Sequence, residues 1–292
     1  MRKKYLSICC ALLLSTLLLG VGVVHSFPVV AKTVKGRPIN RFVMFESQAR
    51  SVFDKMFFAK KNKKRNVAIV GEMLPQADFT KRVNALVGSA KADVYVLDTK
   101  TGHKLTYYNG GANFWLASSV KASILTALVK EDGPLTGDLD QEAQAMITYS
   151  DNDAAVDLFD AAGGFPALER LWSNLSMTET IPNYNGFGLS TSTAGNQIKL
   201  LQDIKTLPAV DHDYILNLMK GITASQRFGI GVMKDPAFKN GWLNADNGSW
   251  YVNSIGFSEK ERYLVAILTQ NNTDQTSGEQ LVSRIAASII KK

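Results

Sequence analysis

A serine and a lysine three residues apart begin a set of polar residues that could together cleave an amide. Ser118 and Lys121 lie in the stretch Ala-Ser-Ser-Val-Lys, which covers residues 117–121. Ser150-Asp151-Asn152 and then Lys239-Asn240-Gly241 follow along the chain. A serine hydroxyl is a poor nucleophile at neutral pH and needs a base within hydrogen-bonding reach. The residue types and their order predict a serine nucleophile that is activated by lysines and not by a histidine.

A helix is expected to bring the first pair together. Residues 118–129 are predicted to be helical because apolar residues recur there at helical spacing: Val120, Ile124, Leu125, Leu128 and Val129. Residues three apart lie on one helix face. Ser118 would lie in the first turn, where free N–H groups and the helix dipole favour negative charge. Lys121 would face the same site, and enclosure there would lower its pKa and let it act as a base.

Single motifs of this set also occur elsewhere in the chain, without the other motifs in the expected order. Lys100-Thr101-Gly102 lies between the strand-like runs 92–97 and 104–108, where a Thr-Gly pair predicts a hairpin turn. Ser288 and Lys291 repeat the serine–lysine spacing near the C-terminus, where we expect the end of an amphipathic helix. Ser150-Asp151-Asn152 taken alone would fit a helix cap or a turn. Its position between the other two motifs favours a catalytic role.

These residues together resemble the class A β-lactamase family, and more closely the β-lactamase-like serine hydrolases found among exported Gram-positive proteins. The resemblance covers roughly residues 75–292. Residues 186–194 are similar to the family's threonine-rich stretch before a helix, and residues 249–256 and 263–269 to its last two strands. The resemblance implies an α+β fold with three layers (α/β/α), in which a helical domain splits an antiparallel sheet, as in β-lactamases and transpeptidases. Further helices are expected at 141–149, 153–161, 165–174, 194–207 and 277–290.

The resemblance also implies roles for the individual residues. Ser118 would be the acylated nucleophile, Lys121 its base, Ser150 a proton relay to the leaving nitrogen, and Lys239 the partner of the substrate carboxylate. Asn152 would bind the substrate's amide side chain, and Asn240 and Gly241 would line the strand along which the substrate lies. The N–H groups of Ser118 and Trp242 would form the oxyanion hole. The expected substrate is a β-lactam or a peptidoglycan-type peptide with a D-alanyl-type amide bond, handled by a monomer without cofactor or metal.

Two features depart from the family pattern. The family's omega-loop glutamate, which activates water for deacylation, has no counterpart in the shorter stretch 178–186. Glu179 falls too early there and is expected to be a solvated loop charge. Asn240 replaces the usual threonine or serine, and its amide can still donate a hydrogen bond, with different geometry. We therefore expect acylation to outlast hydrolysis.

The alternative is a non-catalytic cell-wall-binding or scaffold protein that keeps the fold. The missing glutamate and a basic N-terminal segment favour this alternative. It is opposed by the retention of five residues that a scaffold does not need, which are Ser118, Lys121, Ser150, Asn152 and Lys239.

The net charge of +7 in 292 residues is concentrated near the N-terminus. Residues 2–4 are Arg-Lys-Lys and an apolar run follows from 8 to 24, which predicts a signal peptide or membrane anchor over residues 1–31. A basic stem is expected at 32–70, with a helix at 44–58, and the β-lactamase-like domain at 71–292. The stem is either a solvated linker or a contact to anionic lipid or wall polymer. We expect an exported protein, secreted or attached to the outer face of the cell membrane, and no nucleic-acid partner.

Other chemistries find little support in the residue types. Both cysteines, Cys9 and Cys10, fall in the predicted leader. The three histidines, His25, His103 and His212, are not accompanied by a Gly-x-Ser-x-Gly nucleophile elbow. Asp211-His212-Asp213 is expected in a loop or at an exposed helix start and is too sparse to predict a metal site.

Overall fold

The computed structural model describes residues 71–110 and 114–291. The predicted leader at 1–31, the basic stem at 32–70 and the helix expected at 44–58 lie outside the described residues, so these predictions stay open. Of the helices that the structure describes, none is both long enough and apolar enough to cross a membrane.

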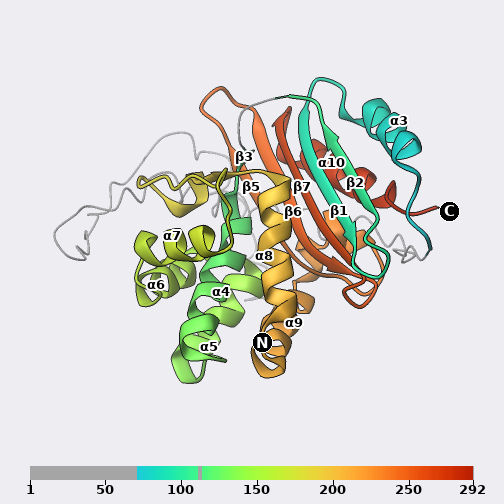
Figure 1. Cartoon of the computed structure of the whole chain (residues 1–292). Helices are drawn as coiled ribbons and strands as arrows, with labels where there is room; N and C mark the ends of the chain where they lie inside the picture. The colour runs from blue at the N-terminus through green and yellow to red at the C-terminus, as the bar shows by residue number, and fades with distance from the viewer. Residues whose placement is uncertain (1–70, 111–113, 292) are drawn as a thin grey trace, which may run out of the picture. The chain divides into compact units, whose positions relative to one another are not determined.

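The centre of the fold is a five-stranded antiparallel sheet whose strands come from two separate parts of the chain (Figure 1). Its order is β2-β1-β7-β6-β5, and the strands are β1 (Lys91–Asp98), β2 (Lys104–Tyr108), β5 (Ala237–Asn244), β6 (Trp250–Ser258) and β7 (Tyr263–Asn272). Each neighbouring pair is antiparallel. Since the first two strands precede the helical block and the last three follow it, the predicted antiparallel sheet split by a helical domain is confirmed.

The burial of each strand follows from its place in the sheet. β7 lies between β1 and β6 and is buried along nearly its whole length, as an apolar strand covered on both faces should be. β1 alternates between buried and half-buried side chains, the period of a strand with one fully covered face. β5 is an edge strand, and its first half is buried.

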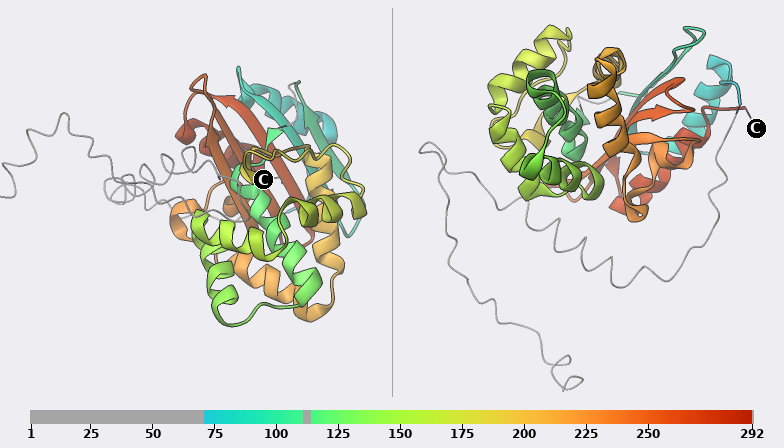
Figure 2. Two further views of the ribbon diagram at one scale, coloured as in Figure 1. Left: turned by 90° about the vertical axis from the view of Figure 1, so that its left-hand side faces the viewer. Right: turned by 90° about the horizontal axis from the view of Figure 1, so that it is seen from below.

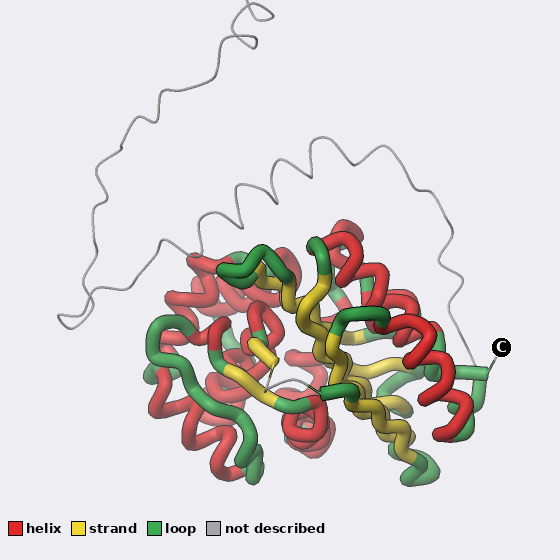
Figure 3. Tube along the Cα trace, turned by 90° about the horizontal axis from the view of Figure 1, so that it is seen from above, coloured by secondary structure: helices red, strands yellow, loops and turns green. Residues whose placement is uncertain are grey.

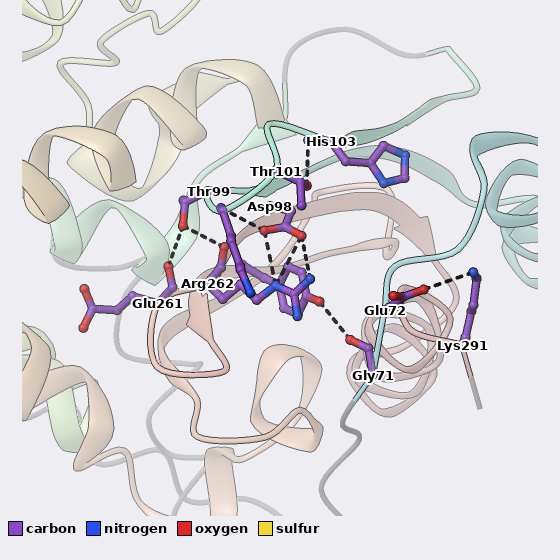
Figure 4. Close-up of polar contacts among 11 residues, drawn as sticks. Gly71, Glu72, Asp98, Thr99, Thr101, His103, Glu261, Arg262 and Lys291 are labelled. Carbon is purple, nitrogen blue, oxygen red and sulfur yellow. Dashed lines mark hydrogen bonds and ion pairs between the residues drawn. The ribbon is translucent and has the colours of Figure 1, made fainter.

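The turn between β1 and β2 is pinned to the turn between β6 and β7. Gly102 has a positive φ of 74°, which supports the interpretation of Lys100-Thr101-Gly102 as a hairpin turn. Arg262 forms an ion pair of 2.9 Å with the buried carboxylate of Asp98, and the Thr99 hydroxyl donates to the carbonyls of Glu261 and Arg262 (Figure 4). The literal Lys-Thr-Gly is thus part of a structural hairpin.

Helices cover both faces of the sheet and complete the three predicted layers (Figure 2, Figure 3). On one face, α10 (Gln275–Ala287) packs on β6 and β7, and α3 (Gln76–Val87) packs on β2. On the other face, α8 (Ala194–Thr206) packs on β1 and β7. The three-layer α+β arrangement is confirmed.

A helical lobe lies beside α8 and is built around α4 (Lys121–Asp132). Eight of the first nine residues of α4 are buried, so this helix is covered on almost every side. The other helices of the lobe are α5 (Gly137–Gln144), α6 (Asn152–Ala161), α7 (Phe165–Asn174) and α9 (Ala209–Lys220). The sequence did not predict α9 as a whole, because its buried residues are confined to Ile215, Leu216 and Met219, and its first turn has no buried residue. His212 lies in that first turn and its Nε2 is 2.7 Å from a carboxylate oxygen of Glu261.

Two very short strands connect the lobe to the sheet region. β3 (Phe114–Trp115) pairs with β4 (Thr191–Ser192), and the N–H of Leu116 donates to the carbonyl of Ser190 at 2.8 Å. This pairing fixes the segment that leads into Ser118 against the segment that leads into α8.

Candidate active site

Ser118 lies on a turn that the sheet and the loop before α8 hold on both sides. Residues Ala117–Val120 form a 3₁₀ turn that continues into α4, so the predicted helix at 118–129 begins as a tighter turn and becomes α-helical at Lys121. Ser118 is half-buried, whereas Ala117, Ser119 and Val120 are buried. Ala117 has a φ of 48°, an uncommon conformation for a residue with a side chain. The turn therefore presents one hydroxyl from an otherwise enclosed and constrained backbone.

Lys121 connects the Ser118 turn to the Ser-Asp-Asn motif. Its side chain has no exposed surface. The Nζ atom donates to the carbonyls of Ser150 and Asp151 at 2.8 and 3.0 Å, to the Ser150 hydroxyl at 3.3 Å, and to Asn152 Oδ1 at 2.7 Å. The structure thus brings Lys121, Ser150 and Asn152 together at the start of α4, and the catalytic and binding roles of these residues stay predictions.

Ser150 occupies its position because the chain changes direction there. A π-helical turn, Ala145–Tyr149, ends at Ser150, which is left-handed with φ 59° and ψ 35°. Asp151 then caps α6 by accepting a hydrogen bond from the N–H of Ala154 at 2.9 Å. A π turn next to a left-handed residue is a local geometry that often accompanies functional sites. The cap interpretation of Ser150-Asp151-Asn152 is therefore correct for Asp151, whereas Ser150 faces the lysines.

Lys239 reaches the same hydroxyl from the sheet. It lies on β5 with no exposed side-chain surface, and its Nζ donates to Ser150 Oγ at 2.9 Å and to the carbonyl of Asn240 at 3.1 Å. The two lysines thus converge on one serine hydroxyl. Among the described residues, neither lysine forms a salt bridge with a carboxylate.

Burial without a paired carboxylate favours the neutral form of both amines. Burial lowers the pKa of Lys239 to about 7. Burial also holds the pKa of Lys121 well below its ordinary value, the nearby Lys239 lowers it further, and Asp151 partly offsets both effects. A neutral Lys121 can accept a proton, which is the property that a general base requires.

Lys239 gives the folding equilibrium a defined pH dependence. Between the folded pKa of about 7 and the ordinary value of 10.5, the unfolded chain binds a proton that the folded chain does not. The free energy of unfolding therefore rises with pH across this window. We expect urea denaturation to show the wild type gaining stability from about pH 7 to about pH 10 relative to Lys239→Met. Loss of Lys239 also removes one cause of the lowered pKa of Lys121. The stability of the variant should then rise less with pH, which adds to the difference expected from Lys239 itself. A stability difference that stays constant across the window would contradict the buried, weakly basic amine.

Gly241 permits β5 to approach the Ser118 turn. A Cβ atom at this position would lie 2.6 Å from the carbonyl oxygen of Leu116 and 2.6 Å from the nitrogen of Ser119, with the nitrogen of Ser118 at 2.9 Å. Such contacts with backbone cannot be relieved by a side-chain movement, so only glycine fits here. The glycine of the Lys-x-Gly triplet thus places the edge of the sheet against the turn that carries Ser118.

Asn240 and Trp242 lie on the same strand with different surroundings. Asn240 is buried, and its amide nitrogen donates to the carbonyls of Gln226 and Phe228 at 2.8 and 3.1 Å. Its amide therefore holds the 226–228 segment against β5, and the predicted substrate contact of this side chain stays a prediction. Trp242 is half-buried and packs edge-to-face on Phe228, with ring centroids 5.9 Å apart.

Glu179 lies at the N-terminus of α8. Its carboxylate is exposed and accepts a hydrogen bond of 3.3 Å from the Thr193 hydroxyl, and Thr193 caps α8. Asp93 of β1 accepts from the N–H of Ala194 at the same helix end, and burial and then Glu179 raise its pKa. No hydrogen bond or ion pair among the described residues links a carboxylate side chain to Ser118, Lys121, Ser150 or Lys239. Within the same residues, no cluster of three or more His, Cys, Asp or Glu could hold a metal ion.

Two buried amides near the site were missed by the sequence analysis. Asn253 of β6 donates to the carbonyls of Trp115 and Leu116, just before Ser118. Gln226 donates to the carbonyl of Tyr149, just before Ser150, at 2.9 Å. An asparagine directly after Trp-Tyr-Val, inside a predicted strand of the sheet, was a signal that could have identified the first residue. Nothing in the local sequence around Gln226 indicates its contact, which joins segments 77 residues apart.

Comparison with known structures supports the fold. A TLA-3 extended-spectrum β-lactamase is 19% identical, with 73% of this chain and 98% of that chain covered and a TM-score of 0.61. A class A β-lactamase from Bacteroides cellulosilyticus DSM 14838 is 15% identical, with 74% and 97% covered and a TM-score of 0.63. PBP-A is 19% identical, with 75% and 98% covered and a TM-score of 0.57. At these identities the likeness establishes the shared fold.

Comparison with protein families gives a match over residues 134–292, which is more than half of the chain. The matched family is described as the beta-lactamase enzyme family. The matched part contains Ser150-Asp151-Asn152 and Lys239-Asn240-Gly241, and it begins after Ser118 and Lys121. Comparison with curated proteins gives no match. With the family matched over more than half of the chain and the fold in agreement, this chain belongs to the beta-lactamase enzyme family.

Proposed function

We propose that the protein is a serine hydrolase that attacks a β-lactam or a D-alanyl-type amide and forms an acyl intermediate on Ser118. The observation that carries the proposal is the convergence of two fully buried lysines on the Ser150 hydroxyl, beside the Ser118 turn. Burying two amines without carboxylate partners is costly for a fold. A wall-binding scaffold would have no use for this arrangement, so the scaffold alternative is not favoured.

The contacts suggest a route for the protons of acylation. Neutral Lys121 takes the proton of the Ser118 hydroxyl as Ser118 Oγ forms a bond to the amide carbon. The carbon–nitrogen bond of the amide then breaks, and Ser150 gives its proton to the leaving nitrogen. Lys121 Nζ lies 3.3 Å from Ser150 Oγ, so the proton taken from Ser118 can replace the one that Ser150 gives up. The transfer between Lys121 and Ser150 follows a hydrogen bond of the structure, and the transfer from Ser118 to Lys121 is inferred from their places on one turn.

The remaining residues would bind the substrate and the developing charge. Lys239 adds positive charge beside Ser150 when it is protonated and would attract a substrate carboxylate. The close approach of Gly241 to the Ser118 turn puts the neighbouring Trp242 near Ser118, which supports an oxyanion hole made from their N–H groups. Asn152 accepts from Lys121 through Oδ1, and its amide nitrogen forms no hydrogen bond among the described residues. That nitrogen would donate to the substrate's side-chain amide.

We propose that the acyl intermediate is long-lived. Deacylation needs a base that activates water, and the acid nearest in sequence to the expected position, Glu179, accepts a hydrogen bond from Thr193, the residue that caps α8. A variant of PBP-A, one of the structural relatives, was solved as an acyl-enzyme complex with penicillin G. This supports a penicillin-binding activity in preference to efficient β-lactam turnover.

Intact-protein mass spectrometry of the full chain with benzylpenicillin over time tests the proposal. We expect a shift by the mass of one intact penicillin that persists after the free drug is removed. A transient shift with consumption of the drug would contradict the slow deacylation and show that water is activated without a glutamate. Absence of a covalent adduct with penicillins and with D-alanyl thioesters would contradict the function itself and favour the scaffold alternative.

A further inference from the structure

The carbonyl groups just before Ser118 are held by an unusual number of donors. The Leu116 carbonyl accepts from the N–H of Ser119 at 3.1 Å, from its hydroxyl at 2.6 Å, and from Asn253 Nδ2 at 3.2 Å. The Trp115 carbonyl accepts from the same Asn253 nitrogen at 2.7 Å. The next residue, Ala117, has the left-handed φ of 48°. A conformation of this kind persists only where its surroundings determine it, and three of these four bonds do not depend on the turn's own backbone N–H groups.

Asn253 is itself fixed at both ends of its amide. It lies on β6 with no exposed surface, and its Oδ1 accepts from the N–H of Thr269 on β7 at 3.2 Å. The pairing of β6 with β7 is irregular between Trp250 and Val252, directly before Asn253. Such irregularities re-aim side chains next to functional sites. The two carbonyls can only accept and the Thr269 N–H can only donate, so the amide has a single orientation.

We infer that Asn253 is a positioning residue for the nucleophile, an inference that rests on the proposed role of Ser118. Its amide ties the central sheet to the two carbonyls that precede Ala117 and thereby sets the direction in which Ser118 leaves the turn. Acyl transfer requires the attacking oxygen to be held close to the line of attack, and a displacement of about 1 Å can reduce a rate about a hundredfold. Asn253 acts through the backbone and touches neither substrate nor the reacting hydroxyl.

Asn272 is a matched control for the effect of replacing a buried asparagine in this sheet. It is 4% exposed and donates to the Trp250 carbonyl at 2.9 Å and to the Thr269 hydroxyl at 3.0 Å. It shares Thr269 as a neighbour with Asn253. Its hydrogen bonds stay within the sheet, so its loss should disturb the sheet and spare the turn.

The experiment compares Asn253→Asp with Asn272→Asp in the full chain. Asn253→Asp keeps the size of the side chain and the acceptor for Thr269, and it removes the nitrogen that donates to both carbonyls. A buried carboxyl that is protonated has a single O–H, which can restore at most one of the two bonds. We expect the acylation rate at saturating benzylpenicillin to fall about a hundredfold while the apparent Kd stays unchanged. We also expect faster amide hydrogen exchange in residues 114–120. Asn272→Asp should change neither. If Asn253→Asp does not fold, Asn253→Ser removes the same two bonds without burying a charge.

Hydrogen exchange keeps this inference separable from the proposed function. Unchanged exchange in residues 114–120 of the Asn253 variant would overturn the inference, whatever the reactivity. Faster exchange with an unchanged acylation rate, or an equal response in the Asn272 variant, would overturn it as well. A wild type that forms no adduct would refute the proposed function, and the exchange data would still decide whether Asn253 holds the turn.

Discussion

Replacing Ser118 with alanine should abolish the penicillin adduct completely. Ser118 is a half-buried residue on the constrained turn, three residues before a buried lysine whose pKa is lowered by burial, and we propose that it is the nucleophile. Removing the attacking oxygen leaves no atom to form the acyl bond, so the loss should be total and not partial. Intact-protein mass spectrometry with benzylpenicillin measures the result, and circular dichroism checks that the variant is folded. Because the side chain is only half-buried, we expect the thermal midpoint to change little.

The C-terminal copy of the motif supplies the matched control. Ser288 has the same spacing to Lys291, but its hydroxyl donates to the Arg284 carbonyl at 2.7 Å, at the end of α10. Lys291 pairs with Glu72 near the surface and does not approach Ser288. Ser288→Ala should therefore label as the wild type does. Labelling that survives Ser118→Ala would place the nucleophile elsewhere.

Replacing Lys121 with methionine should lower the acylation rate by about 10²–10⁴-fold, the usual contribution of a general base. Methionine has a similar length and no proton-accepting nitrogen, so it fills the space without the chemistry. The change also removes the hydrogen bonds to the Ser150 and Asp151 carbonyls and to Asn152. Stopped-flow or quenched labelling with penicillin measures the rate, and urea denaturation measures the accompanying change in stability.

Lys130 on the same helix is the control for this substitution. Its Nζ pairs with Asp203 at 2.7 Å near the surface, an interaction of about 0–1 kcal/mol at most sites of this kind. Lys130→Met should leave the acylation rate unchanged. If Lys121→Met also acylates at the wild-type rate, Lys121 is not the base. Among the residues that the structure describes, Lys239, with its pKa lowered to about 7, would then be the other fully buried amine that could serve.

Local patterns predicted most of the fold because they record local physics. β1 and β2 were found from their apolar runs and the Thr-Gly turn, and the turn glycine has the positive φ that the turn requires. The helices α6, α7 and α8 were found within a residue or two of their bounds from the spacing of apolar residues. Helix α9 was missed because its buried face is short and is confined to Ile215, Leu216 and Met219. The strands β3 and β4 were missed because two-residue strands carry no periodicity.

The contacts that set the site depend on pairings over long sequence distances. Asn253 bonds to carbonyls 137 and 138 residues away, and Gln226 to one 77 residues away. No local pattern encodes such pairs, since each depends on which strand or loop packs beside which. Asn240 shows the same limit of sequence analysis. Its residue type predicted a contact with the substrate, whereas in the fold its amide nitrogen donates to the carbonyls of Gln226 and Phe228.

The sequence by itself determined which reactive groups are available to the proposed chemistry. The types and order of Ser118, Lys121, Ser150 and Lys239 specify a serine and two lysines, because a side chain's reactive atoms belong to its residue type. Only the tertiary structure decided how deeply those groups are buried, which pKa values the lysines have, and which atoms they contact. Burial removes both lysines from water, lowers their pKa values, and brings their Nζ atoms to one hydroxyl. The charge of an amine depends on its surroundings, and those surroundings exist only once α4, the π turn before Ser150 and β5 have packed together.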